Sequence, residues 1–88
     1  MKTFVKQPRD RLDYDIDLSD WLEKSDEIEA VDVTAPDGIS LDQISVLPTR
    51  IKLWISGGTS GQTYKFSPLI HTESRSKEVD FIIVVAEE

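Results

Sequence analysis

Cysteine and asparagine are both absent from this 88-residue sequence. Without cysteine the chain has no disulfide framework and no thiolate metal site, and without asparagine it has no N-glycosylation sequon. Long apolar runs are missing too: Phe4-Val5 is the only apolar pair before Leu12, so we expect neither a secretory signal nor a membrane span. These absences predict one small domain, made and kept in a cytoplasm, whose stability depends on its hydrophobic core.

Positive charge is scarce and unevenly placed. Lysine and arginine number 10 against 17 acids, a net charge of −7. Because nucleic-acid binding usually rests on clustered cations, we expect no nucleic-acid partner. Residues 1–9 carry three cations and no acid, whereas residues 10–42 carry twelve acids and two cations. The sequence is therefore polarised into a basic beginning, an acidic half and a neutral remainder.

A sustained helical period is also missing, and alternating apolar and polar residues predict strands instead. Pro68 predicts that its strand lies at an edge or breaks there. Three glycines, at positions 57, 58 and 61, predict a sharp turn before Tyr64. The chain is therefore expected to be an all-β sandwich. The predicted strands cover residues 12–18, 28–34, 44–47, 50–56, 63–72 and 77–86.

The last predicted strand is apolar on both faces. Residues 81–85 read Phe-Ile-Ile-Val-Val, whereas a strand of a sandwich is expected to be apolar inward and polar outward. If Phe81 and Ile83 face the core, Ile82 and Val84 face outward. In so small a domain these two side chains need cover, either from a partner subunit or from the N-terminal segment folded back over them.

Residues 1–9 are interpreted as an arm, because Pro8 interrupts any strand ladder. One interpretation is a loose terminus. The other uses Phe4 and Val5 as anchors on a neighbouring subunit, with Lys2 and Lys6 facing its acids.

Asp13, Asp15 and Asp17 suggest at first a calcium-binding loop. Counting from Asp13, however, the sixth position is Leu18 rather than glycine, and the twelfth is Lys24 rather than glutamate. On a strand the three aspartates share one face. We expect that face to be solvated or to meet a positively charged protein partner, and we rank bound metal last.

Trp54 and His71 are the remaining candidates. Trp54 lies in phase with Lys52 and opposite Ile51, so we interpret it as an interface anchor before a core residue, and as a sugar-binding platform third. His71 is the only histidine. Without cysteine or a second imidazole it cannot build the usual zinc site, and we expect an ordinary strand or turn histidine. With no nucleophile, base or metal set to name, we predict no enzyme, no catalytic residue and no cofactor.

Two stretches carry a resemblance to a known family. The first is LDYDID, residues 12–17, which runs on to Trp21-Leu22 and is preceded by the opening MKTFVK; the second is SGGTSGQTY, residues 56–64, with the closing hydrophobic strand. In this combination the sequence resembles small phage virion proteins described as fibre-tail adaptor proteins with an immunoglobulin-like fold. The resemblance implies a non-enzymatic structural protein of the phage particle, present in several symmetric copies, and it supplies no catalytic residue.

We therefore predict a small immunoglobulin-like antiparallel β-sandwich of about six to seven strands over residues 10–88, with an N-terminal arm over residues 1–9. It is expected to be made in the host cytoplasm and to connect tail and fibre components in the virion through other phage structural proteins. A basic arm and an acidic strand are complementary between copies, which favours a homo-oligomeric ring. A capsid decoration (cement) protein and a carbohydrate-binding module on the virion are the alternatives. The candidate interface residues are Lys2, Phe4, Val5, Lys6, Asp13, Asp15, Asp17, Trp54, Ile82 and Val84.

Overall fold

The computed structural model describes residues 2–87, and over that range the chain forms nine strands and no helix. No helix in this range therefore has the length and apolar character needed to cross a membrane. The predicted all-β fold class is confirmed. The strands are β1 (Lys2–Lys6), β2 (Arg11–Asp17), β3 (Ala30–Asp32), β4 (Ile39–Val46), β5 (Arg50–Gly57), β6 (Thr63–Phe66), β7 (Leu69–His71), β8 (Ser76–Glu78) and β9 (Phe81–Val85).

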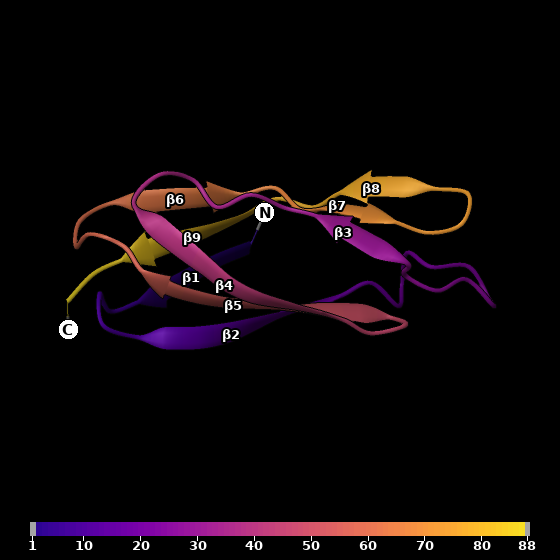
Figure 1. The fold of residues 1–88 in the computed structure, drawn as a ribbon, viewed down its shortest axis with the longest axis horizontal. Helices are drawn as coiled ribbons and strands as arrows, with labels where there is room; N and C mark the ends of the chain where they lie inside the picture. The colour runs from indigo at the N-terminus through magenta and orange to yellow at the C-terminus, as the bar shows by residue number, and fades with distance from the viewer. Residues whose placement is uncertain (1, 88) are drawn as a thin grey trace.

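The strands form two layers, which Figure 1 shows along the length of an elongated molecule of 42 × 20 × 16 Å. One layer is the antiparallel sheet β2-β5-β4. The other contains the sheet β1-β9-β6 and, beyond it, the sheet β3-β7-β8. The Val79 amide donates to the Pro68 carbonyl at 2.9 Å where both β6-β7 and β8-β9 are interrupted. The predicted break at Pro68 is therefore confirmed, and the two sheets continue one another across it.

Strand β1 comes from the segment that the sequence sets apart as an arm. It pairs in parallel with β9 of the same chain, from Lys2 opposite Phe81 to Lys6 opposite Val85. Every other strand pair within residues 2–87 is antiparallel. Strand β1 is thus an edge strand, and β9 is the central strand of its sheet.

The core lies between the layers and follows the strand alternation. Ile51, Leu53 and Ile55 of β5 are fully buried, as is Ile83 of β9. The rings of Phe66 and Phe81 stack with centroids 5.2 Å apart. Burying each such side chain stabilises the fold by about 1.5–3 kcal/mol, so the central strands β5 and β9 hold the sandwich together.

The glycine-rich turn between β5 and β6 is as sharp as the sequence predicts. Gly58 has a φ of 93°, and a Cβ atom there would lie 2.7 Å from Cγ2 of Val85. Only glycine fits this close approach without displacing the core strand. The turn is closed by the Thr59 amide, which donates to the Tyr64 hydroxyl at 2.9 Å.

Candidate protein interface

The outward face of the sheet β1-β9-β6 carries an apolar strip that consists of Val5, Ile82 and Val84. Val5 lies beside Val84 in the parallel pairing, and paired residues of neighbouring strands point to the same face. Val5 is 54% exposed, whereas Ile82 and Val84 are half-buried because β1 and β6 flank them. Thr3 and Lys65 are exposed next to Ile82 on the same face. The strip is therefore an apolar centre with polar neighbours.

The inward face of β1 belongs to the fold. Phe4 packs on Tyr14 and Phe81, with ring centroids 4.9 and 5.9 Å away. Lys6 is only 1% exposed. Its ammonium donates to the Gln7 carbonyl at 2.6 Å and to the Gly57 carbonyl, and burial lowers its pKa. Of the four candidates on β1, Val5 is thus on the outward strip, Phe4 and Lys6 are on the inward face, and Lys2 is exposed at the end of the strand.

Asp13, Asp15 and Asp17 do share one face, on the outside of the other layer. In the antiparallel register Asp15 lies beside Lys52 and Asp17 beside Arg50 of β5. The Lys52 ammonium is 3.3 Å from Oδ2 of Asp13 and 3.9 Å from Oδ1 of Asp15. We call this outward surface of β2 and β5 the charged face. Its aspartates lie beside cations of their own sheet, so much of its charge is compensated within the chain.

A fourth carboxylate, Asp42, organises the neighbouring edge of the charged face. It lies at an irregularity in the β4-β5 register between Leu41 and Gln43. Its oxygens accept hydrogen bonds from the hydroxyls of Ser40 at 2.6 Å and Ser56 at 2.7 Å, and from Nε of Arg11 at 3.1 Å. The Ser40 hydrogen bond is the main cause that lowers the pKa of Asp42. This role could not be predicted from sequence, because it depends on the register of three strands.

Trp54 lies on the charged face, half-buried and opposite the inward-facing Leu53 and Ile55, which is the side the alternation indicates. The Arg11 guanidinium lies 4.9 Å from its ring centroid. One face of the indole is thus occupied by a cation of the same chain. A sugar would have to displace Arg11 or use the other face.

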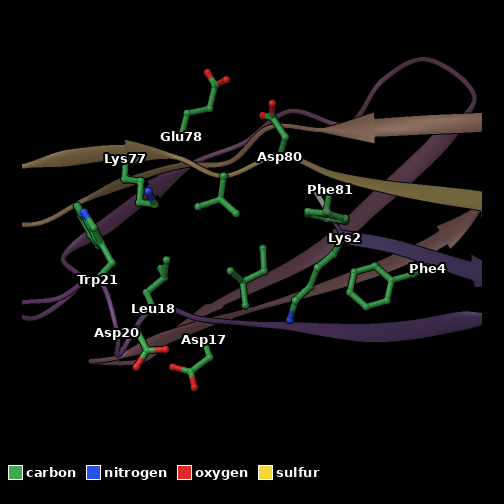
Figure 2. A pocket seen from close by; sticks show the side chains of 12 residues that line it. Lys2, Phe4, Asp17, Leu18, Asp20, Trp21, Lys77, Glu78, Asp80 and Phe81 are labelled. Atoms are coloured by element: carbon green, nitrogen blue, oxygen red, sulfur yellow. The ribbon is translucent and has the colours of Figure 1, made fainter.

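A cleft of about 540 Å³ opens between the two layers, partway along the molecule, where β1 begins and β2 ends (Figure 1). Figure 2 shows its lining from close by, with Lys2 reaching across the middle and acidic side chains on opposite sides. The walls come from the start of β1, the end of β2 with the turn after it, and the link from β8 to β9. We call it the end cleft. Its lining residues are Lys2, Phe4, Ile16, Asp17, Leu18, Asp20, Trp21, Lys77, Glu78, Val79, Asp80 and Phe81.

The end cleft was not predicted from the sequence, although two of its lining residues, Lys2 and Asp17, were predicted as interface residues on the arm and on the aspartate face. Its rim is fixed by Arg75, whose guanidinium stacks 4.5 Å from the Trp21 ring centroid. The same guanidinium donates to the Trp21 carbonyl at 3.1 Å and lies 3.4 Å from Oδ2 of Asp26. Residues 21 and 75 are too far apart in sequence for periodicity to link them. An isolated tryptophan in a polar turn was the only signal available.

The possible metal ligands and the single histidine were considered as a candidate reactive site. Within residues 2–87 no group of three histidine, aspartate or glutamate side chains is arranged to hold a metal ion. His71 lies on β7, with Nε2 2.8 Å from Oδ2 of Asp32 and Nδ1 2.8 Å from Oγ of Ser76. Since Asp32 is on β3 and Ser76 on β8, the imidazole ties together the three strands of its sheet, as an ordinary strand histidine does.

The comparison with known families agrees with the fold. Residues 6–84 match the model of the family described as podophage GP4 fiber-tail adaptor protein gp77. No curated protein matches the sequence. The family match covers the glycine-rich turn and the aspartate-bearing strand β2, which both belong to the resemblance, but begins at residue 6 and so omits residues 1–5 of the opening MKTFVK. The chain therefore belongs to the podophage GP4 fiber-tail adaptor family, and it is a structural component of the phage particle that interacts with other tail and fibre proteins.

Proposed function

We propose that this protein connects tail and fibre components by burying its apolar strip against a neighbouring protein of the particle. In this proposal the chain is a non-enzymatic connector, made in the host cytoplasm and assembled in several symmetric copies. Family membership supports the connector role in general. The exposure of the apolar strip supports the choice of this surface as the contact.

The observation that carries the proposal is the apolar outward face of a central strand. Ile82 and Val84 alternate with the buried Phe81, Ile83 and Val85, so β9 is apolar on both sides. Among the residues that the structure describes, neither Ile82 nor Val84 packs against the core cluster. Apolar surface kept in contact with water and bordered by polar residues is typical of a protein interface.

The edge position of β1 adds to the strip. Val5 is more than half exposed, on a strand that has a neighbour on one side only. A partner that covers Val5 therefore also covers the free edge of β1, which would otherwise invite unspecific strand pairing. Each Å² of apolar surface buried in this way contributes about 25 cal/mol.

The proposal is tested by placing a charge on the strip in phage. We expect Val5→Asp to prevent incorporation of the protein into particles, and hence fibre attachment, while the purified variant still folds. Val46→Asp is the matched control, because Val46 is a 44% exposed valine on the edge strand β4 of the other layer. Quantifying the protein in purified virions separates the outcomes. If Val5→Asp particles contain normal amounts of the protein and carry fibres, the strip is not the contact.

A further inference from the structure

We propose that the end cleft is a receptor for an extended segment of another protein in which apolar residues alternate with lysine or arginine. This inference rests on the proposed function, since a connector has to hold more than one partner. It concerns a different surface, however, because the apolar strip faces outward from the sheet whereas the end cleft lies between the layers.

The floor of the end cleft is apolar and fixed in place. Phe4, Leu18 and Phe81 line it, and Phe4 is held by its ring contacts with Tyr14 and Phe81. Leu18 and Phe81 are only 4% and 2% exposed, so the apolar surface open to an occupant comes from half-buried residues such as Phe4, Ile16 and Val79. A volume of about 540 Å³ exceeds that of a single side chain and lies in the range of about 300–1,000 Å³ usual for ligand sites. The cleft thus offers room for two or three side chains on a preformed surface.

The rim of the end cleft selects for positive charge. Four of its lining residues are acids, against two lysines, and one of the acids, Asp80, is paired with Lys65 outside the cleft at 3.5 Å. Asp20 and Glu78 are exposed and form no ion pair with any residue that the structure describes. Figure 2 shows them on opposite sides of the opening. The backbone hydrogen bond from Ser19 is the main cause that lowers the pKa of Asp17, which keeps that carboxylate charged. A segment that enters between these groups gains from cationic side chains on both sides.

The elements beside the end cleft favour an extended occupant. Strands β1 and β2 are both edge strands, one of each layer; β1 begins and β2 ends at the cleft. An edge strand offers unpaired backbone groups to an added strand. In an added strand alternate side chains point to opposite sides, so apolar residues can reach the floor while lysine or arginine residues reach the rim.

Two lysines of the lining oppose this occupant: Lys77, whose ammonium lies 6.0 Å from the Trp21 ring centroid, and Lys2. The side chain of Lys2 reaches into the cleft in Figure 2, and it is exposed. A cationic segment has to displace or repel it. Removing this side chain is therefore expected to improve binding, which distinguishes a real receptor from a surface where any substitution is harmful.

The test uses the tryptophan at the rim as a reporter. In the Trp54→Phe variant Trp21 is the only tryptophan, so its fluorescence reports on the end cleft. The probe is an eight-residue synthetic peptide of alternating valine and arginine. We expect saturable binding, with amide shifts in NMR spectra confined to residues 2–4, 16–21 and 77–81. Peptides that alternate valine with glutamate, or serine with arginine, are expected to bind at least about tenfold more weakly, which corresponds to about 1.4 kcal/mol.

Charge variants made in the same background complete the test. We expect Asp20→Lys and Glu78→Lys each to weaken binding of the valine-arginine peptide by about fivefold or more, and Lys2→Ala to strengthen it. Asp37→Lys is the control, because Asp37 lies in the turn before β4 and does not line the cleft. The inference fails if the peptide does not bind, or if the shifts map to the charged face and the rim variants bind normally. Either result leaves the connector proposal standing, since that proposal depends on Val5→Asp particles.

Discussion

The two outward faces of this sandwich are built on opposite principles. On the outward face of the sheet β1-β9-β6, Val5, Ile82 and Val84 form an aliphatic centre that does not pack against the core cluster within residues 2–87. On the charged face Asp13 and Asp15 share the ammonium of Lys52, and Asp17 lies beside Arg50 in the strand register. We therefore expect the apolar face to gain from a partner, whereas much of the charge on the other face is compensated by its own side chains. From sequence the aspartates of β2 were interpreted as a solvated face or as a surface for a positively charged partner, and the strand register favours the apolar face as the better candidate.

The largest expected effect comes from exchanging the character of the two faces. We expect Val84→Asp to weaken association with purified tail complexes by at least about tenfold, because a buried unpaired carboxylate replaces an apolar contact. Asp15→Ala on the charged face is expected to change association by less than about twofold, as exposed ion pairs contribute little. Binding measured by surface plasmon resonance separates the two. Equal losses for both variants would mean that the faces do not differ in role.

A second comparison lies within β1, where Lys6 is buried and Lys2 is exposed at the start of the strand. Lys6→Met is expected to lower the free energy of unfolding by about 1–3 kcal/mol, because the Gly57 and Gln7 carbonyls lose their donor. Lys2→Met, at the exposed end of the same strand, is expected to change it by less than about 0.5 kcal/mol. Chemical denaturation of both variants is the measurement. A loss in Lys2→Met as large as that in Lys6→Met would contradict the structural role of the buried lysine.

The buried lysine also has a pH signature. Burial lowers the pKa of Lys6 below the 10.5 of a free side chain, so between these two values the unfolded chain binds more protons than the folded one. Stability conferred at this site is therefore expected to rise as the pH increases through that window. The wild-type protein should show this rise relative to Lys6→Met. Parallel stability curves for the two proteins would show that burial does not act on the charge of Lys6.

On the charged face a smaller effect is expected from Lys52. We expect Lys52→Met to lower the free energy of unfolding by at most about 1 kcal/mol at low salt, since Asp13 and Asp15 then repel one another. The loss should shrink as added salt screens the two carboxylates. Lys24→Met is the control, because Lys24 is exposed and lies in the turn region between β2 and β3. A loss that persists in high salt would indicate lost packing rather than lost charge pairing.

The sequence was informative where a feature is local. Alternation placed Ile51 and Leu53 inward and Trp54 outward, and Pro68 marked the break between β6 and β7, all of which the structure confirms. What escaped sequence reasoning depends on contacts between distant strands. The parallel pairing of β1 with β9 is an example: it turns Lys6 from a surface cation into a buried donor to Gly57. No local pattern records which strand a terminal segment will join.

The same limit explains the candidate surfaces. Val5, Ile82 and Val84 could each be named from their runs, but only the register unites them on one face. The end cleft could not be predicted at all, since its walls come from the beginning, the first quarter and the end of the chain. The aspartates of β2 could be recognised from the sequence, but the β5 cations Lys52 and Arg50 that lie beside them could not, because their position depends on the register.

The smallest expected effect concerns acid stability at Asp42, where the charged face is most tightly bonded. Hydrogen bonds from Ser40 and Ser56 hold the pKa of this carboxyl below its free value of 3.8. Its contribution to stability is therefore fully present above pH 3.8 and is lost as the pH falls through the lower folded-state pKa.

We expect wild-type protein to be more stable than Asp42→Asn at neutral pH, and this difference in stability to disappear in stronger acid. Asp37→Asn, in the turn before β4, is the control. Thermal unfolding midpoints between about pH 2 and pH 7 give the answer, and a gap of constant size would show that Ser40 and Ser56 bond equally well to the neutral group.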